Sequence, residues 1–476
     1  MALQFYDTRR RRKVAFEPLV PGKVRLYTCG PTVYNDAHIG NFRTYMFEDL
    51  LRRTLKYLGY EVTQVMNITD IDDKTIKAAI QTGVSLAEYT RPFIDHFFAD
   101  LKALKIETAE VYPRATRHIS EMIELIAKLI EKGVAYEAEG NVYYSVEKFA
   151  AYGQLSGMNL EKLERGVRID ADEYEEKESF RDFALWKGWT PDDGDVGWES
   201  PWGRGRPGWH IECSAMSMKY LGETFDIHTG GVDNIFPHHE NEIAQSVAAT
   251  GKEFVRYWLH SAHLQVEGEK MSKSLGNFFR LRELIDKGYS ARAIRYVLLA
   301  SHYRQRVNFS TETITAAQGG IERLDTLRLA SEKASGEGSV RPELTEQIEK
   351  WNAAFAEGLE NDLNISGALA ALFELVSAGN RLATATPFNK AEGEAILKAW
   401  HRFDEVLGFL FWDDLPEEIL ALIRERNTAR QNRDFAKADA NRRELATKGY
   451  QIKDGKAGVD VTWATGESSG SAWVGK

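Results

Sequence analysis

Cysteine is scarce in this sequence: among 476 residues, only Cys29 and Cys213 carry a thiol. Two cysteines exclude a disulfide framework and favour a reducing compartment. Long apolar runs are also missing. A basic run at 9–13 follows the first residues directly, an order that is wrong for a signal peptide. The most apolar stretch, 368–376, contains Glu374 and is too short to span a bilayer. We therefore expect a cytoplasmic protein without a membrane partner.

An excess of basic charge is lacking as well, because the formal net charge is −10 at pH 7. This value argues against a nucleic-acid partner, since phosphate binding requires a basic surface. Lysine and arginine nevertheless cluster near both ends of the chain, so the question stays open. With 43% hydrophobic and 28% charged residues, the composition is that of an ordinary soluble globular protein. The length indicates about three domains.

A dinucleotide-binding G-x-G-x-x-G motif is absent, although the first part of the chain has the pattern of a βαβ unit. Residues 23–28 alternate like a strand that ends at Cys29. A helical pattern follows over 45–58, and a second strand is expected at 61–66. Ligands of such a unit bind at the carboxyl ends of its strands, which is where Cys29 lies.

Two short motifs suggest phosphate chemistry. His38-Ile39-Gly40-Asn41 stands at the start of the expected helix, where backbone N–H groups favour phosphate. Taken alone, these four residues also fit a simple helix-entry turn. The run at 270–274 places two lysines around small residues and forms a cationic loop, which by charge alone would be a solvated surface loop.

Histidine is concentrated in one stretch, since six of the 11 histidines lie between 210 and 263. His238 and Glu242 are four positions apart on an expected helix and so share one face. An imidazole and a carboxylate on one face form half of a zinc site, and thiolates are the usual other half. The tetrad Cys29–Cys213–His238–Glu242 is therefore a candidate zinc site. A helix-capping histidine and two small buried cysteines would explain the same residues, so spacing alone leaves both interpretations open.

Longer motifs resemble a known family. Residues 201–213 (Pro-Trp-Gly-Arg-Gly-Arg-Pro-Gly-Trp-His-Ile-Glu-Cys) and 236–245 match the pattern of cysteinyl-tRNA synthetases nearly throughout, and 29–34 and 67–74 resemble it closely. The motif that ends at Asn41 looks like the HIGH signature of class I aminoacyl-tRNA synthetases, with asparagine in place of the last histidine. Asparagine can still donate a hydrogen bond to ATP, but it cannot carry charge. The run at 270–274 (Lys-Met-Ser-Lys-Ser) is the second class I signature.

The resemblance to the cysteinyl-tRNA synthetase family covers about residues 5–463. It implies an α/β fold with a Rossmann-like parallel sheet split by an insertion, then a helical bundle and a small C-terminal α/β domain. We expect the first half of the catalytic domain at 1–110, the connective insertion at 111–200, the second half with the zinc site at 201–290, the tRNA-binding bundle at 291–412, the anticodon-binding domain at 413–463 and a disordered tail at 464–476.

The same resemblance implies roles for particular residues. One zinc ion per subunit is expected on Cys29, Cys213, His238 and Glu242. The cysteine pocket is expected to be lined by Thr32, Trp209, His228 and Asp233. ATP, bound with Mg²⁺, is expected to contact His38, Gly40, Asn41 and Lys273. Catalysis is assigned to Lys273, Lys270, His38 and Asn41, with the lysines stabilising charge as pyrophosphate leaves.

The implied activity is the ligation of L-cysteine to tRNA(Cys), in two steps driven by ATP. Cysteinyl-adenylate forms with release of pyrophosphate, and cysteine then passes to the tRNA 3′ end. Zinc binds a thiolate far better than a serine hydroxyl, so it would select the substrate without editing. Basic residues at 424–448 concentrate positive charge where the family reads the anticodon, which answers the net-charge objection in part. The family suggests a monomer.

Two rival functions remain at this point. A related ligase activates cysteine in the same way but joins it to an amino-sugar; it lacks the anticodon-binding portion, so the long C-terminal third argues against it. A catalytically dead paralogue could bind tRNA or zinc as a regulatory module. The presence of both class I signatures and of the whole tetrad disfavours that alternative.

Overall fold

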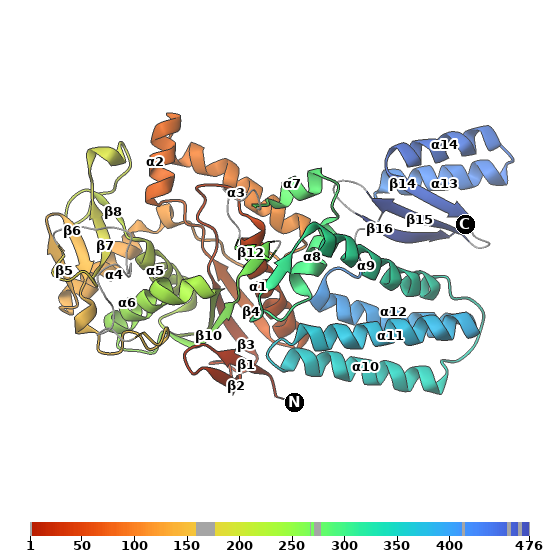
Figure 1. The fold of residues 1–476 in the computed structure, drawn as a ribbon, viewed down its shortest axis with the longest axis horizontal. Helices are drawn as coiled ribbons and strands as arrows, with labels where there is room; N and C mark the ends of the chain where they lie inside the picture. Colours follow the sequence, from red (N-terminus) through yellow and green to blue (C-terminus); the bar gives the residue numbers. More distant parts are fainter. Residues whose placement is uncertain are drawn as a thin grey trace. The chain divides into compact units, whose positions relative to one another are not determined.

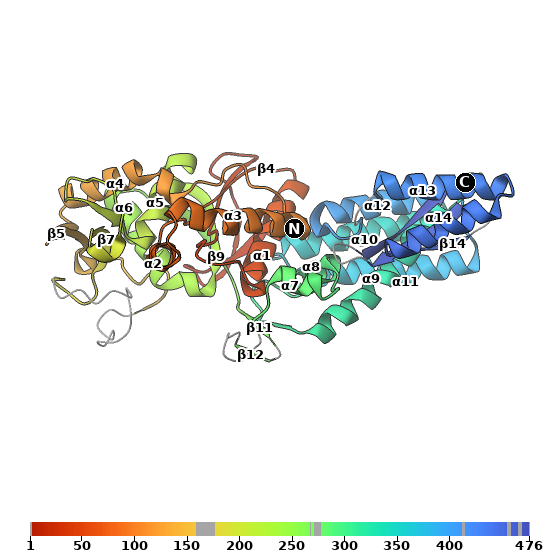
Figure 2. The ribbon, with the colours of Figure 1, turned by 90° about the horizontal axis from the view of Figure 1, so that it is seen from above.

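The computed structural model describes residues 2–158, 177–266, 268–270, 278–411, 415–454, 458–464 and 469–475. The chain divides into two compact units (Figure 1; Figure 2). The N-terminal unit consists of 4–99 and 107–263, and the C-terminal unit consists of 1–3, 100–106 and 264–476. Within the described part of the chain, no helix combines the length and the apolarity that crossing a membrane requires.

A parallel four-stranded sheet organises the N-terminal unit. Its strand order is β10-β9-β3-β4, with β3 at Lys23–Thr28, β4 at Glu61–Met66, β9 at Phe225–Gly231 and β10 at Val255–Ser261. All seven residues of β9 are buried, as expected for a central strand of a covered parallel sheet. Helices α1 (Ile39–Tyr57) and α5 (Trp209–Leu221) pack against the sheet.

The sheet contains a topological switch point between β3 and β9. These neighbours are parallel, with Tyr27 opposite His228, but the chain continues from β3 to β4 on one side and from β9 to β10 on the other. Ligands of open α/β sheets bind outside the carboxyl ends of the strands at such a point. Cys29 follows β3 there, and Asp233 lies just beyond β9.

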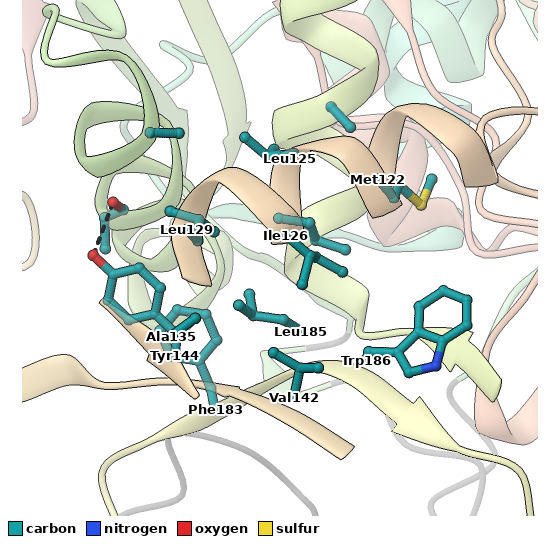
Figure 3. Close-up of a cluster of buried hydrophobic side chains, with 14 of the residues drawn as sticks. Met122, Leu125, Ile126, Leu129, Ala135, Val142, Tyr144, Phe183, Leu185 and Trp186 are labelled. Atoms are coloured by element: carbon teal, nitrogen blue, oxygen red, sulfur yellow. Dashed lines mark hydrogen bonds between the residues drawn. The ribbon is translucent and has the colours of Figure 1, made fainter. Parts of the chain in front are cut away.

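An α+β insertion separates the two halves of this sheet. Helix α4 (Ile119–Glu131) carries apolar residues at helical spacing that pack on an antiparallel sheet of order β5-β6-β7-β8 (Figure 3). The strands are β5 (Ala135–Ala138), β6 (Asn141–Tyr144), β7 (Phe183–Gly188) and β8 (Gly205–Pro207). The Tyr144 hydroxyl donates a 3.0 Å hydrogen bond to the carbonyl of Ala244 in α6 (Glu240–Thr250). The insertion core thereby supports the helix that carries Glu242.

Three further elements complete the N-terminal unit. The hairpin of β1 (Gln4–Asp7) and β2 (Arg12–Ala15) packs by β1 against β10. Helix α2 (Asp73–Thr82) is capped by Asp72, whose side chain accepts from the Lys74 amide. It is followed by α3 (Leu86–Ala103), whose last turn belongs to the C-terminal unit.

The C-terminal unit is mostly helical. A three-stranded sheet of β11 (Leu264–Val266), β12 (Glu269–Lys270) and β13 (Val307–Phe309) stands beside the short helices α7 (Leu281–Asp286) and α8 (Ala291–Leu299). Four long helices follow: α9 (Thr311–Glu332), α10 (Pro342–Glu360), α11 (Ile365–Ala385) and α12 (Lys390–Leu407). A small α/β domain ends the chain, with α13 (Glu417–Gln431), α14 (Phe435–Thr447), β14 (Tyr450–Asp454), β15 (Gly458–Ala464) and β16 (Ser469–Gly475).

The expectation of a disordered tail at 464–476 is wrong for 469–475, whereas 465–468 and 476 lie outside the described residues. Residues 469–475 form β16, which pairs antiparallel with β15 so that Val474 lies opposite Val459. Val474 packs against the core of the small domain, and the ladder satisfies the backbone of both strands. The glycines and serines of this segment hide its strand character, because composition does not reveal a partner strand. The rest of the expected fold class is confirmed.

Candidate metal and nucleotide site

The loop after β3 is built around a close backbone approach. A Cβ atom at Gly30 would lie 1.8 Å from the carbonyl oxygen of Asn67, so only glycine fits. The Gly30 amide donates to Asn67 Oδ1 at 2.9 Å. Thr69 donates its amide to the Pro31 carbonyl, and it forms a parallel bridge with Thr32. These contacts fix the half-buried Thr32 and the buried Cys29 at the end of β3.

His38 and Asn41 form a reciprocal cap at the start of α1. His38 Nδ1 accepts from the amides of Gly40 and Asn41, at 3.1 and 3.3 Å. Asn41 Oδ1 in turn accepts from the His38 amide at 3.0 Å. Since Nδ1 is an acceptor, the proton of a neutral His38 is on Nε2. The cap therefore uses Nδ1 of His38 and Oδ1 of Asn41, and the other polar group of each side chain is an N–H donor.

Glu242 is the centre of a buried imidazole cluster. Its Oε1 lies 3.0 Å from His238 Nε2 and 4.0 Å from His239 Nε2, while Oε2 lies 3.0 Å from His228 Nε2. A π-helical turn at Ile235–His239 precedes α6 and brings both His238 and His239 to the inside. Burial raises the pKa of Glu242, but the charges of His228 and His238 outweigh it and lower the pKa to about 2.

The two cysteines meet beside this cluster. The Cys213 thiol, one turn into α5, is in hydrogen-bond contact with Cys29 and with His238. The hydrogen bond from Cys29 is the main cause that lowers the pKa of Cys213 to about 6. The same hydrogen bond raises the pKa of Cys29. Cys29 Sγ also lies 3.3 Å from His239 Nε2. The pair therefore favours a thiolate on Cys213 next to a thiol on Cys29.

A second row of histidines supports the first. His239 Nδ1 lies 2.8 Å from His260 Nε2, and His260 Nδ1 lies 2.7 Å from the hydroxyl of Thr8 in the turn after β1. On the other side, His210 Nδ1 lies 2.9 Å from His238 Nδ1. Burial lowers the pKa of His260 to about 3, so this imidazole is neutral. Such outer hydrogen bonds fix the tautomer and orientation of a metal-ligating imidazole.

The donor atoms fit a metal ion. One ligand atom from each of Cys29, His238, His239 and Glu242 lies within 4.8 Å of the others. Although Glu242 Oε1 is 3.0 Å from His238 Nε2, it is buried and accepts no hydrogen bond from the described residues. Burial lowers the pKa of His238, yet the charges of Glu242 and Cys213 raise it to about 10. The cluster therefore stabilises positive charge at its centre, as a cation site must.

The expected cysteine-pocket residues surround this cluster unevenly. Trp209 is 44% exposed and stacks on His238, with ring centroids 4.4 Å apart. Asp233 is exposed and bends back over Gly231, where an added Cβ would lie 2.4 Å from its Oδ1. His228 is fully buried behind Glu242 and stacks on Trp258.

Comparison with known proteins gives the family. Residues 15–319 match the model of the class I (C) tRNA synthetase catalytic domain, 354–411 match a DALR domain, and 413–461 match the cysteinyl-tRNA ligase anticodon binding domain. The chain is 49% identical to the cysteine–tRNA ligase of Chlamydia muridarum (strain MoPn / Nigg), over 97% of this chain and 99% of the relative. It is 48% identical to the enzyme of Brachyspira hyodysenteriae (strain ATCC 49526 / WA1), over 96% and 98%. The chain belongs to the cysteinyl-tRNA synthetase family.

Solved structures agree on the fold of this synthetase. Mycobacterium tuberculosis methionyl-tRNA synthetase in complex with methionyl-adenylate is 16% identical, with a TM-score of 0.60 over 82% of this chain and 90% of that chain. The same enzyme bound by methionyl-adenylate in a second structure is 14% identical, with a TM-score of 0.62 over 81% and 92%. At this identity the likeness shows the class I fold alone.

Sequence reasoning did not include His239 among the residues whose nitrogen, sulfur or oxygen atoms converge at the candidate metal site of this synthetase. His239 and Glu242 are three positions apart, which also places two residues on one helix face, so the spacing contained the signal. The expected phosphate loop is only partly visible: Lys270 ends β12 by its backbone, and Lys273 lies outside the described residues.

Proposed function

We propose that this synthetase activates L-cysteine with ATP and transfers it to the 3′ end of tRNA(Cys). The observation that carries the proposal is the convergence of two thiols, an imidazole and a carboxylate beside the switch point of the sheet. The capped start of α1 begins ten residues after Cys29. Catalysis is mainly positioning and stabilisation of phosphate charge, without a covalent enzyme intermediate.

We assign the four zinc ligands to Cys29, Cys213, His238 and Glu242, with one ion per subunit. His239 is left out of the set because both of its nitrogens have other partners. If the Thr8 hydroxyl donates to His260 Nδ1, the proton of a neutral His260 is on Nε2 and is donated to His239 Nδ1. The proton of His239 is then on Nε2, which donates to Cys29 Sγ. His239 is then a donor that orients a thiolate rather than a metal ligand. Two thiolates, one imidazole and one carboxylate are a donor set that zinc accepts.

The site supplies selectivity for cysteine. When bound, zinc acts as a Lewis acid that lowers the pKa of a thiol and holds the thiolate. A hydrophobic pocket alone would discriminate only about 10–200-fold between such close analogues as cysteine and serine. We assign Trp209, Asp233 and Thr32 to the pocket around the amino acid, and His228 to the orientation of Glu242, which it contacts at 3.0 Å.

ATP is assigned to the start of α1. The cap uses Nδ1 of His38 and Oδ1 of Asn41, so we assign the contacts to ATP to the opposite side of each group, the Nε2–H of His38 and the Nδ2–H group of Asn41. Gly40 has no side chain, so a phosphate can approach the positive end of the helix dipole closely. Lys270 and Lys273, with Mg²⁺, would neutralise the charge that develops as pyrophosphate leaves.

The small C-terminal domain is assigned to the anticodon of tRNA(Cys). Not all of its basic residues serve this purpose. Arg426 is 2% exposed and donates to Asp454 at 2.6 Å, so its charge is neutralised within the domain and does not face RNA. Arg433, Arg442 and Arg443 are exposed and form a basic surface. A domain of this kind disfavours the ligase that joins cysteine to an amino-sugar. The monomeric state and the cytoplasmic location stay predictions.

The test is charging with labelled cysteine, ATP, zinc and a tRNA(Cys) transcript, with serine as the competing substrate. Cysteine esterified to the tRNA, with serine rejected, supports the whole proposal. Adenylate without charging would point to another acceptor, such as an amino-sugar. Loss of both activities in zinc-loaded protein would leave a binding module and refute the proposal.

A further inference from the structure

The turn between β1 and β2 carries a row of positive charge that none of the roles above uses. Residues 9–13 are Arg-Arg-Arg-Arg-Lys, and all five are exposed. The whole chain has a net charge of −10, so this row is a local reversal of sign. Five consecutive like charges are usually solvated tails, but here they are part of an ordered hairpin.

The fold holds part of this row in place. The Arg10 guanidinium donates to the Arg256 carbonyl at 2.8 Å and lies 5.6 Å from the centre of the Tyr257 ring. Arg256 lies over the same ring at 5.8 Å and adds a sixth cation. Asp7, 3.4 Å from Arg10, and Glu253, 3.2 Å from Arg9, pair with two of these cations. Arg10 and Arg256 are preorganised on the same aromatic ring.

Arg11 occupies a position that favours glycine. Its φ angle is +54°, in the left-handed region where a side chain is strained. Its amide donates to the Asp7 carbonyl at 2.7 Å and closes the turn. A glycine would close the same turn without the strain. The arginine is not needed to close the turn; its guanidinium lies over Gly157 of the insertion, where an added Cβ atom would clash with it, and so holds a cation at the surface beside the hairpin.

The row lies at the end of the sheet that is opposite to the candidate active site. Its contacts, Glu253, Arg256 and Tyr257, stand at or before the amino half of β10, whereas Cys29 follows the carboxyl end of β3. Since these strands are parallel, the contacts of the row are at the amino ends of the strands and Cys29 is at their carboxyl ends. A ligand of the row is therefore not the reacting 3′ end of a tRNA.

We propose that the cations of residues 9–13 and Arg256, the hairpin cation row, bind the sugar-phosphate backbone of RNA away from its 3′ end. The proposal rests on the proposed function, which makes RNA the polyanion that this protein meets. Five of the six cations in the row are arginines, whose planar guanidinium forms bidentate hydrogen bonds with phosphate. Among the described residues of the hairpin, no large apolar side chain is exposed, so the row lacks the apolar centre of a protein interface or a membrane-inserting surface.

The experiment compares two variants of the full chain that lose the same charge. Arg11→Gly/Arg12→Gln/Lys13→Gln removes three cations of the row, and the glycine relieves the strained turn, so the variant keeps its fold. Lys128→Gln/Lys132→Gln/Lys148→Gln removes three exposed lysines of the insertion and is the control. Fluorescence anisotropy measures the binding of labelled tRNA(Cys) and of an unrelated tRNA transcript across a salt series.

We expect the hairpin variant to bind both transcripts roughly tenfold more weakly, with a plot of log Kd against log salt that is shallower by about two units. Backbone contacts carry no sequence information, so the two RNAs lose affinity alike. Pyrophosphate exchange and zinc content stay at the wild-type level, because the variant leaves Thr8 and its contact with His260 unchanged. The control variant keeps most of its affinity.

Two results would overturn the proposal. An equal loss of RNA affinity in the hairpin variant and the control variant would reduce the effect to net charge. Unchanged RNA binding by the hairpin variant, together with lost binding to phosphatidylserine vesicles, would assign the row to a membrane. Failure of the wild type to charge tRNA would count against the proposed function instead. RNA binding would still be measured in that case, so the two failures are distinguishable.

Discussion

Asn41 Oδ1 accepts a hydrogen bond from the backbone amide of His38 at 3.0 Å, so the residue that departs from the class I signature closes the cap of α1. The geometry separates two tasks within one side chain. The carbonyl oxygen caps the helix, and we assign the Nδ2 group to the contact with ATP. Asparagine can therefore keep both the structural and the donor function of this position without a charge.

Asn41→Ala removes both functions, and Asn41→Asp removes one. We expect the alanine variant to lose about 1 kcal/mol of unfolding free energy, as for other lost caps, and to show a higher KM for ATP. The aspartate keeps an acceptor for the His38 amide, so its stability in denaturant should match the wild type while its KM for ATP rises. Equal stability of all three proteins would contradict the assigned cap.

Cys213→Ala should abolish zinc retention and adenylate formation together. The variant loses a thiolate donor and the hydrogen-bond contacts that Cys213 makes with Cys29 and His238. Zinc per subunit, measured after gel filtration, and pyrophosphate exchange with cysteine are the two readouts. A metal-free variant with wild-type exchange would refute the zinc assignment.

His239→Gln separates a ligand from a residue that orients one. Since we place His239 between Cys29 and His260, the variant should keep zinc at saturating metal but bind it 10–100-fold more weakly. Competition with a chelator gives this affinity. Complete loss of zinc, as in Cys213→Ala, would show that His239 belongs to the ligand set.

Lys273→Ala should lower kcat for cysteine activation with little change in zinc content. The role that we propose for Lys273 is to stabilise charge on the leaving pyrophosphate, so its removal should raise the energy of the transition state more than that of bound ATP. Arg282→Ala is a suitable control, because Arg282 pairs with Asp100 inside the C-terminal unit at 2.9 Å. Wild-type turnover of the Lys273 variant would remove the second class I signature from the mechanism.

Zinc-free protein should show an acid-dependent loss of stability that Glu242 causes. Its pKa in the folded protein, about 2, lies below the ordinary value of 4.5. Such a depressed pKa stabilises the fold fully above pH 4.5 and progressively less as the pH falls toward 2. The difference in denaturation midpoint between wild type and Glu242→Gln, in chelator, should therefore shrink from pH 7 to pH 3. A constant difference would mean that no charge on Glu242 is stabilised.

The sequence predicts the fold well where periodicity and motif coincide. The strands before Cys29 and around 61–66, and the helix that carries Glu242, follow from alternation and from helical spacing. β16 escapes the same reasoning, because small polar residues become a strand only when a partner such as β15 offers its edge.

The inner part of the candidate site was foreseeable, and its outer part was not. His238 and Glu242 share a face by their spacing, and thiols complete a zinc set by chemistry. The link from Cys29 through His239 and His260 to Thr8 joins segments more than two hundred residues apart. No local pattern encodes such a tertiary contact, and Thr8 would not be noticed in its turn.

The insertion places Cys29 on one side and the remaining three donors on the other. During synthesis, Cys29 leaves the ribosome first. It must stay reduced, without its partner thiol, until α5 and α6 have been translated and have docked on the sheet. A chain truncated within the insertion carries only one of the four ligands that we assign. Metal retention then reports that the N-terminal unit has been completed, and premature oxidation of that early thiol would stop assembly before any active site exists.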